Sequence, residues 1–177
     1  MVSDKKQALN YLSKFSNLTR TILELTEKET ISIAEEVKTL SLYLEIEKAR
    51  FDDDFDYQII VAPEIDSEQT KIPSMLLQPY VENAIKHGIS NRLKGGEIII
   101  KCYEGLTDDL YIQVKNSGQL KSQPFAKKKN GEGHGITNTI QRLKLIYGER
   151  ASFKIFNSGN DFVITEIKIP KQSLTLG

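Results

Sequence analysis

The amino-acid sequence predicts an α+β fold, in which a helical hairpin precedes a two-layer α/β sandwich with a mixed sheet. Over roughly the first fifty residues, apolar side chains recur at the three- and four-residue spacing of amphipathic helices. Further along the chain, short strand candidates are interspersed with two more helical patterns. Helices and strands mixed in this order favour one sheet that is covered on one face by helices.

Two amphipathic segments form the predicted hairpin. The first runs from about Lys5 to Leu25, and the second begins at Ser32-Ile-Ala-Glu35, which has the form of a capping box. We expect the two helices to pair antiparallel around residues 27–30, each burying the apolar face of the other. The residues that define these faces are Ala8, Leu12, Phe15, Thr19 and Ile22 in the first helix, and Ile33, Val37, Leu40, Leu44 and Phe51 in the second.

The strand candidates follow an acidic run at residues 52–56, which we interpret as a solvated turn at a domain boundary. We therefore expect a helical segment at residues 1–55, the sandwich at residues 56–172 and a tail at residues 173–177. Residues 119–130 lack periodicity and are expected to form a mobile loop. The predicted strands are residues 57–62, the hairpin 97–103 and 110–115, and the pair 152–156 and 162–169.

Three polar residues are concentrated in the segment Gln78–Gly88. Asn83, Lys86 and His87 lie three and four positions apart, so on a helix they share one face. They could hold a metal ion together with phosphate oxygens, since hard oxygen ligands suit Mg²⁺ and lysine supplies a point charge. The alternative is a solvated helix face that ends in a glycine cap, with Glu82 and Lys86 as an ordinary ion pair.

A glycine-rich segment, Gly131–Gly148, supplies the phosphate-binding counterpart. Glycines at alternate positions lead directly into a helical pattern. Such glycines allow backbone N–H groups to approach a phosphate, and the helix N-terminus adds donors and a positive dipole end. The segment lies downstream of a strand that ends in Asn116-Ser117-Gly118. The apolar face of its helix consists of Ile136, Ile140, Leu143 and Tyr147, and Gly148 is placed to end it.

In this order and spacing, the segments resemble the ATP-binding domain of sensor histidine kinases, within the superfamily shared by gyrase, the heat-shock chaperone ATPases and the mismatch-repair ATPases. Residues 43–51, 72–88 and 131–148 are most similar to the subgroup whose phosphoacceptor helix carries a Pro-His-Phe-Leu-Phe-Asn motif. The resemblance covers nearly the whole chain. It implies a Bergerat-type ATP-binding fold, preceded in residues 1–55 by the end of a dimerisation and phosphoacceptor region.

The resemblance implies roles for the residues of the first motif. Asn83 would be the ligand of Mg²⁺, while Lys86 and His87 would neutralise or hydrogen-bond phosphate oxygens. A helix-terminal cation that balances the dipole is the alternative for His87. In hydrolytic relatives the general base lies one helical turn before the asparagine, where this chain has Pro79, and we assign no such role to Glu82. Transfer of phosphate to a protein acceptor is therefore expected, rather than hydrolysis.

The resemblance also implies a nucleotide-binding set, with one departure from the pattern. The superfamily has Asp-x-Gly-x-Gly after the strand, and its Asp binds the adenine amino group, whereas this chain has Asn116 and, in place of the second glycine, Leu120. Asn116 still offers an acceptor oxygen, although an uncharged acceptor makes a weaker bond, and Leu120 argues against a tight turn. For Arg142, a fold-stabilising ion pair is an alternative role. The implied nucleotide-binding residues are Asn116, Gly118, Gly131, Gly133, His134, Gly135, Ile136, Asn138 and Arg142.

The acceptor histidine is expected outside this chain. Its two histidines, His87 and His134, both fall in nucleotide motifs, and the resemblance places the acceptor helix just upstream of residues 8–12. Met1 is therefore expected to mark a start within a longer protein, and the chain is expected to bind ATP and Mg²⁺ without phosphorylating itself in cis. The implied partners are a response regulator and, through the helical segment, a second copy of the parent protein. The parent would be an inner-membrane sensor with this part in the cytoplasm.

Composition is consistent with this interpretation and argues against other classes. The 24 basic and 24 acidic residues balance, so no global charge attracts nucleic acid or an anionic membrane. A single cysteine, Cys102, allows no disulfide within the chain. No apolar stretch of the sequence approaches the roughly 20 residues that span a bilayer, so this part is not expected to be membrane-embedded.

Two other functions stay open. The departures at Asn116 and Leu120 would suit a degenerate nucleotide-binding scaffold, which a titration without ATP binding would favour. The other is an anti-sigma-type serine kinase on the same fold, and the paired helices before Pro63 argue against it. Phosphotransfer to a supplied acceptor-helix peptide, compared with transfer to a serine-bearing protein, would separate the two kinases.

Overall fold

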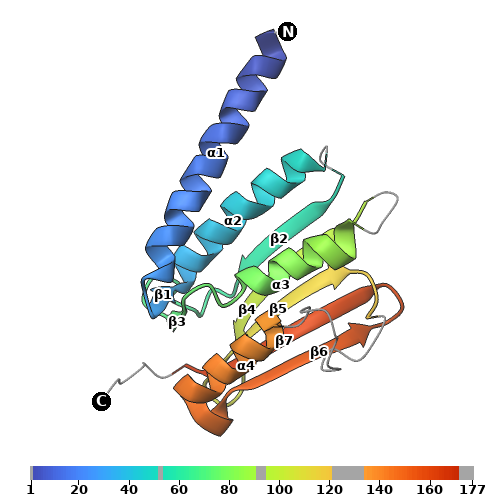
Figure 1. The fold of residues 1–177 in the computed structure, drawn as a ribbon. Coiled ribbons are helices and arrows are strands. Elements are labelled where there is room, and N and C mark those ends of the chain that lie inside the picture. The colour runs from blue at the N-terminus through green and yellow to red at the C-terminus, as the bar shows by residue number, and fades with distance from the viewer. Residues whose placement is uncertain (1, 52–53, 91–94, 121–133, 172–177) are drawn as a thin grey trace.

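The computed structural model describes residues 2–51, 54–90, 95–120 and 134–171 (Figure 1). A helical hairpin comes first, and helices and strands are then interspersed along the chain. The elements in chain order are α1 (Val2–Thr26), β1 (Thr30–Ser32), α2 (Ile33–Arg50), β2 (Asp56–Val61), β3 (Lys71–Pro73), α3 (Gln78–Asn83), the π-helical η1 (Ala84–Ile89), β4 (Glu97–Glu104), β5 (Asp109–Ser117), α4 (His134–Tyr147), the 3₁₀-helical η2 (Gly148–Arg150), β6 (Ser152–Ser158) and β7 (Phe162–Pro170).

The main sheet has five strands in the order β2-β4-β5-β7-β6. β2 pairs with β4 in parallel, and the other neighbours pair antiparallel, which confirms the predicted mixed sheet. The hairpin expected from the sequence is present, because β4 pairs with β5, and the last two predicted strands pair with each other as β6 and β7. A separate two-stranded sheet pairs β1 with β3, and neither of these strands was predicted.

One face of the main sheet is covered by α2, α3 and α4 (Figure 1). Side chains alternate along β5 and β7 between buried and half-buried, as expected of a sheet with one covered face. The predicted two-layer α/β sandwich, preceded by a helical hairpin, is therefore confirmed. Its core includes Ile98, Ile100, Cys102, Leu110, Ile112, Val114, Ile167 and Ile169 from the sheet, and Leu40, Leu44, Tyr80, Val81, Leu143 and Tyr147 from the helices.

The capping box predicted at the start of α2 is formed. The Glu35 backbone N–H donates to Ser32 Oγ at 3.1 Å, and the Ser32 backbone N–H donates to Glu35 Oε2 at 2.8 Å. Lys28 Nζ donates to the other Glu35 oxygen at 2.8 Å, and this contact is the main reason that the pKa of Glu35 falls to about 2. These bonds satisfy donors that a helix start otherwise leaves without partners, so α2 begins where the sequence predicts.

The buried face of α2 belongs to the sandwich. Leu40 and Leu44 have no solvent-exposed surface and share one apolar cluster with Ile98 and Ile112 of the sheet. The predicted interval 56–172 therefore does not contain the whole core of the sandwich, which extends upstream through α2. A capping box and an apolar stripe predict that α2 is a helix with one buried face, but they do not show what that face packs against. The sequence therefore predicted only its pairing with α1.

The apolar face predicted for α1 is not buried along its length, which corrects one expectation. Leu12 is 60% exposed and Phe15 is 51% exposed, whereas Leu18 and Leu25 are buried. The predicted stripe lies on a side of α1 that faces away from α2, because Phe15 is exposed although its neighbour Lys14 pairs with Glu45 of α2. Both buried leucines lie in the C-terminal half of α1.

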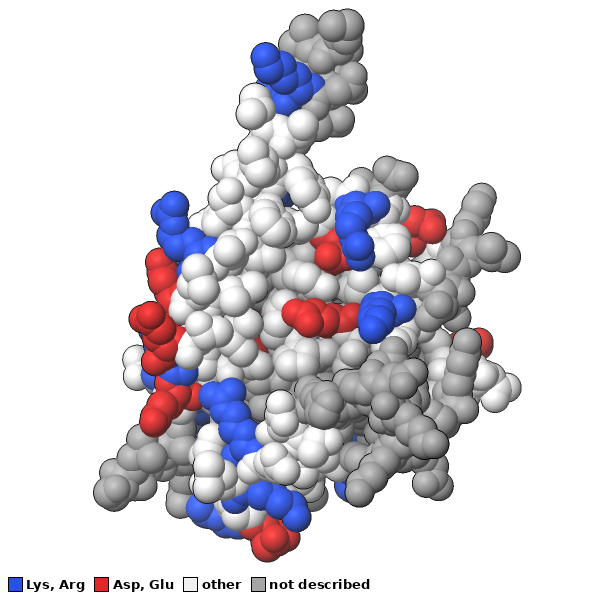
Figure 2. Space-filling view, in the orientation of Figure 1, with Lys and Arg blue, Asp and Glu red and all other residues white. Residues whose placement is uncertain are grey.

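Surface charge follows the balanced composition. On the face shown in Figure 2, basic and acidic side chains are interspersed over the described residues. None of the described helices is long and apolar enough to cross a bilayer.

Candidate nucleotide-binding site

The segment Gln78–Gly88 is helical, as predicted, but its second half is wider than an α-helix. α3 ends at Asn83 and continues directly into η1. In this turn the Ser90 backbone N–H donates to the carbonyl of Ile85, five residues earlier, at 2.9 Å. The regular three- and four-residue spacing assumed from the sequence therefore changes just after Asn83. Single π-helical turns of this kind are often found at functional sites.

The polar residues of this segment lie on its accessible side. Ala84 and Ile85 are each 2% exposed and fix the turn against the core. Asn83 is half-buried, while Lys86 and His87 are exposed. The structure thus places an amide, an ammonium group and an imidazole within one stretch of helix, accessible from solvent and held by buried neighbours.

Gly88 is the point at which this helix meets the end of β5. A Cβ at Gly88 would lie 2.4 Å from the carbonyl oxygen of Ser117 and 2.5 Å from Asn116 Nδ2. Gly118 has φ +134°, and a Cβ there would lie 3.4 Å from the Cα of Gly88. The two motifs that the sequence places about thirty residues apart are therefore in direct contact. Gly88 serves this contact and lies within η1, so it is not a glycine cap beyond the helix end.

Asn116 occupies the position predicted to recognise adenine. It is 9% exposed and lies on the sheet face that the helices cover, since it pairs in register with buried Ile98 and with Val163. Its Nδ2 donates to the carbonyl of Ser117 at 2.8 Å. This bond engages the donor end of the amide, so the acceptor oxygen is the atom suited to bind a ligand's amino group.

The chain after β5 is held by the turn between β6 and β7. The Gly118 backbone N–H donates to the carbonyl of Asp161 at 2.8 Å, and the Leu120 backbone N–H donates to Asn157 Oδ1 at 3.0 Å. Gln119 also donates through its side chain to the carbonyl of Asn160. Leu120 therefore does not prevent an ordered backbone over residues 118–120, because hydrogen bonds to the β6–β7 hairpin hold it.

α4 follows the glycine-rich segment, as the sequence predicts. Gly131 and Gly133 lie outside the described residues. His134 and Gly135 are the first two residues of α4, although the side chain of His134 lies outside the description. Ile136 is half-buried against the core. The helix ends where predicted, because Gly148 has φ +61°, the left-handed conformation of a helix C-terminus. Farther along the first turns of α4, Asn138 is exposed.

Arg142 makes contacts that favour a role in the fold. Its Nη1 donates to the carbonyl of Ser74 at 2.5 Å, and its Nη2 donates to the carbonyl of Glu29 at 3.0 Å. These acceptors belong to the chain before α3 and to the turn after α1, so the guanidinium joins α4 to both. This agrees with the fold-stabilising alternative, but the partners are backbone carbonyls where an ion pair was expected.

Sequence reasoning missed Glu36, a carboxyl within the core. Glu36 is 1% exposed, and its Oε1 accepts a hydrogen bond from the backbone N–H of Leu77 at 2.8 Å. A signal was present in the sequence, because position 36 lies three residues after Ile33 and four before Leu40, on the apolar stripe of α2. A charged residue on such a stripe indicates a buried partner, but the sequence does not reveal which one.

The donors available in this region fit a metal ion that is bound together with a nucleotide. Among the described residues, no three His, Cys, Asp or Glu side chains are grouped so as to hold a metal ion on their own. Asn83 offers one amide oxygen, and Mg²⁺ commonly takes its other ligands from phosphates and water. The residues present therefore fit Mg²⁺ with phosphate better than a metal enclosed by protein ligands.

Comparison with known proteins supports a histidine kinase. The sequence model of a family described as histidine kinase matches residues 1–55. The sensor histidine kinase BtsS of Escherichia coli is 30% identical over 167 residues, which cover 93% of this chain and 27% of BtsS. The sensor histidine kinase/phosphatase LytS of Staphylococcus aureus is 28% identical over 169 residues, which cover 90% of this chain and 29% of LytS. This chain thus spans less than a third of the length of both relatives.

Structural comparison agrees on the fold. The histidine kinase domain of the blue-light activated histidine kinase from Erythrobacter litoralis is similar with a TM-score of 0.58 and 16% identity, over 91% of this chain and 75% of that domain. The class of the protein is therefore an α+β chain with the fold of histidine kinase catalytic domains. The chain is therefore similar to histidine kinases both in sequence and in fold.

Proposed function

We propose that this chain is the ATP-binding catalytic region of a two-component sensor histidine kinase, of the subgroup with a Pro-His-Phe-Leu-Phe-Asn acceptor motif. Its activity would be transfer of the γ-phosphoryl group of ATP to a histidine outside this chain, and from there to a response regulator. The observation that carries the proposal is the contact of Gly88 with Asn116 and Gly118, which brings the helix of Asn83 against the adenine-type motif.

Each motif then has a chemical task. Asn83 would hold Mg²⁺ through its amide oxygen, and Lys86 and His87 would bind phosphate oxygens on the same exposed side. Mg²⁺ held there would supply positive charge to balance the phosphate groups during transfer. Asn116 would accept a hydrogen bond from adenine, with Gly118 beside it. The glycines of residues 131–135 and the first turns of α4, including His134, Ile136 and Asn138, would surround the phosphates.

The residues around Asn83 favour phosphate transfer over hydrolysis. The position one helical turn earlier is Pro79, in the first turn of α3, and proline cannot take a proton from water. The nearest carboxyl on the helix is Glu82, whose Oε1 accepts a hydrogen bond from Gln78 Nε2 at 3.0 Å. That bond holds the carboxyl on the helix surface, so it does not replace the missing base.

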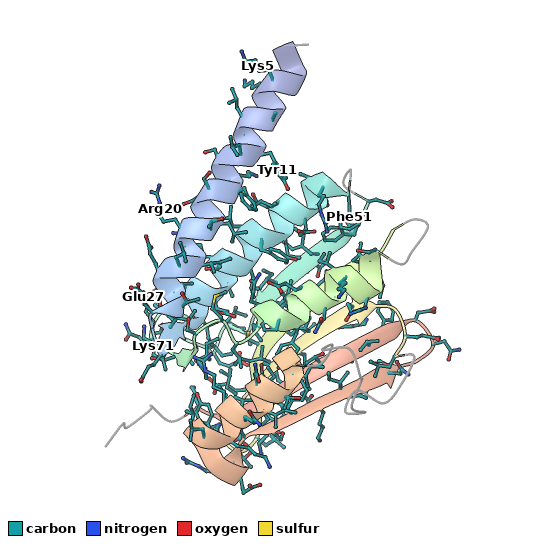
Figure 3. All side chains as sticks on the ribbon, viewed as in Figure 1. Lys5, Tyr11, Arg20, Glu27, Phe51 and Lys71 are labelled. Carbon is teal, nitrogen blue, oxygen red and sulfur yellow. The ribbon has the colours of Figure 1, made fainter. Side chains whose placement is uncertain are left out.

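The exposed face of α1 supports a homodimer formed through the helical segment. Leu9, Leu12 and Leu23 are 59%, 60% and 63% exposed, and their positions follow one heptad seam. A groove of about 590 Å³ runs along this side of α1 and is lined in part by Leu9, Leu12 and Arg20. Figure 3 shows Arg20 on the side of α1 that faces away from α2. We place the parent protein in the inner membrane, with this region in the cytoplasm.

Phosphotransfer in trans tests the function. We expect the chain, incubated with ATP and Mg²⁺, to phosphorylate the histidine of a supplied acceptor-helix peptide that contains Pro-His-Phe-Leu-Phe-Asn. Mass spectrometry should find no stoichiometric phosphohistidine on the chain itself, because His87 and the helix that starts at His134 belong to the nucleotide motifs. The control peptide has glutamine in place of histidine.

Other outcomes of this assay identify the alternatives. Stoichiometric phosphohistidine on the chain would contradict an acceptor outside it. Phosphorylation of a serine-bearing protein in place of the peptide would indicate a serine kinase on the same fold. Absence of both transfer and ATP binding would indicate a degenerate scaffold, to which the asparagine at position 116 is suited.

A further inference from the structure

We propose that Glu36 is a positioning residue of the nucleotide site. Its buried carboxyl reaches from α2 to the backbone N–H of Leu77, the N-cap residue of α3, and so sets the position of the helix that carries Asn83. The inference rests on the proposed function, because it concerns how that site is held in place.

The start of α3 needs a cap from elsewhere in the fold. The residue at its N-cap is Leu77, which has no side-chain group that could accept from the helix, and no side-chain cap is formed. Leu77 is 1% exposed, so its backbone N–H cannot turn to water. Glu36 Oε1 accepts this N–H at 2.8 Å across 41 residues of sequence. The backbone groups of Met75 and Gln78 lie near the same carboxyl and lower its pKa, while Glu36 Oε2 has no hydrogen-bond partner among the described residues.

The backbone before α3 is shaped for this contact. Met75 has φ +56°, a left-handed backbone conformation that residues other than glycine rarely adopt. Such a conformation persists only where surrounding contacts hold it. The hydrogen bond from Leu77, two residues after Met75, to Glu36 is a contact of that kind.

Contacts from two other helices also hold this segment. Ser74 Oγ donates to the carbonyl of Leu25 near the end of α1 at 2.6 Å. The carbonyl of Ser74 accepts from Arg142 of α4 at 2.5 Å. We call Glu36, Ser74, Leu77 and Arg142 the α3 anchor. Through it, α1, α2 and α4 all bind the few residues that determine where the helix of Asn83 begins.

Ionisation of Glu36 provides a test of the anchor. Burial raises the pKa of the Glu36 carboxyl from 4.5 to about 7, and the hydrogen bond from Leu77 acts in the opposite direction. The charged and titratable groups that face it from neighbouring elements, among the described residues, are Arg142 of α4 and the Cys102 thiol of β4. In the closed state, the start of α3 packs against Glu36; in the open state, this segment separates and the carboxyl is solvated. A raised carboxyl pKa means that Glu36 binds its proton more tightly in the closed state than in the open state. The closed state therefore loses stability as pH rises from about 4.5 to about 7, and loses no more above that pH.

Native-state hydrogen exchange measures this opening directly. In the wild-type chain without nucleotide, the opening constant of the Leu77 amide should rise about tenfold per pH unit between about 5 and 7, after correction for intrinsic exchange. Glu36→Gln keeps an acceptor but cannot ionise, so its opening constant should not change with pH. Glu36→Ala removes the acceptor, and the Leu77 amide should lose at least tenfold in protection at every pH. The amide of Ile112, in the centre of the sheet, reports whether the whole domain has unfolded.

Nucleotide binding measures the consequence for the site. We expect Glu36→Ala to weaken the binding of ATP with Mg²⁺ at least tenfold at pH 7, and Glu36→Gln to restore it to within about threefold of the wild type. The matched control is Glu45→Gln on the same helix, where the carboxyl is exposed and pairs with Lys14 at 2.6 Å. Because exposed ion pairs contribute little, this variant should behave as the wild type in both measurements.

Three results would overturn the proposal. One is equal protection of the Leu77 amide in the wild type and in Glu36→Ala, and another is the same pH dependence in Glu36→Gln as in the wild type. The third is unchanged ATP affinity in Glu36→Ala when the wild type binds ATP. If the wild type binds no ATP at any pH, the proposed function fails, and hydrogen exchange at Leu77 still decides whether Glu36 holds α3. If Glu36→Ala also exposes Ile112, the comparison of the wild type with Glu36→Gln decides it.

Discussion

Gly88→Ala is expected to destabilise the fold by about 1–3 kcal/mol and to weaken ATP binding at least tenfold. The new methyl group would lie 2.4 Å from the carbonyl oxygen of Ser117 and 2.5 Å from Asn116 Nδ2. The first is backbone in a five-stranded sheet, and the second belongs to a side chain that is 9% exposed, so neither can move aside easily. Relief of the clash would separate the helix of Asn83 from the end of β5. Urea unfolding and a nucleotide titration measure the two effects.

Gly148→Ala is the matched control for this substitution. Gly148 has φ +61° with no atom within 4 Å of a Cβ placed there, so alanine would add conformational strain without a clash. The expected cost is about 1 kcal/mol, with ATP affinity retained because Gly148 ends α4 on the side away from its glycine-rich start. Unchanged stability and unchanged ATP binding in Gly88→Ala would contradict the close contact of the two motifs.

Leu44→Ala is expected to destabilise the sandwich by about 2–5 kcal/mol. Leu44 has no exposed surface, and it shares the core with the sheet, although it lies in the part of the chain that the sequence assigned to a separate helical segment. Removing its side chain leaves a cavity between α2 and the strands, which the packed neighbours fill only in part. Urea or thermal unfolding, followed by a signal from the sheet, measures the loss.

Leu12→Ala tests the same change of residue in the other helix of the hairpin. Leu12 is 60% exposed on α1, so its truncation should change the stability of the monomer by less than about 0.5 kcal/mol. If both leucines behaved alike, α2 would not be part of the sandwich core. A larger effect of Leu12→Ala at high protein concentration would fit the homodimer proposed through α1.

Much of the fold could be predicted from the sequence because many of its features depend only on residues that lie close together in the chain. The reciprocal bonds of Ser32 and Glu35 lie within one helical turn, so the capping box located the start of α2. Alternating burial in β5 and β7 and the left-handed Gly148 are equally local. Each of these features depends on neighbours in the sequence, and the start of α2 and the end of α4 were found where predicted.

Features that depend on distant parts of the chain could not be predicted. The pairing of Ile31 with Ile72 in β1 and β3 joins short strands about forty residues apart, and neither is long enough to show a pattern. The burial of Glu36 and the attachment of Arg142 to Ser74 depend on how three helices meet. The exposure of Leu12 depends on which side of α1 packs against α2, and the spacing of apolar residues in the sequence does not reveal that side.

The candidate site was predictable in its parts, while its assembly required the structure. The positions of Asn83 and Asn116 followed from motifs, since the residue types suit a metal ion and a base. The π-helical turn after Asn83 has no signature in the sequence. The contact of Gly88 with Gly118 could not be foreseen either, because a glycine needed for close approach resembles one that ends a helix.

Calorimetric titration of ATP, with and without Mg²⁺, tests the central claim most directly when the wild type is compared with Asn83→Ala. We expect the wild type to bind ATP at least tenfold more tightly with Mg²⁺ than in a chelator, and Asn83→Ala to lose this difference while it keeps the weaker, metal-independent binding. Asn17→Ala, on the exposed surface of α1, is the control and should match the wild type. Equal Mg²⁺-dependent affinity in Asn83→Ala, or no binding of ATP by the wild type, would contradict the assignment of this site.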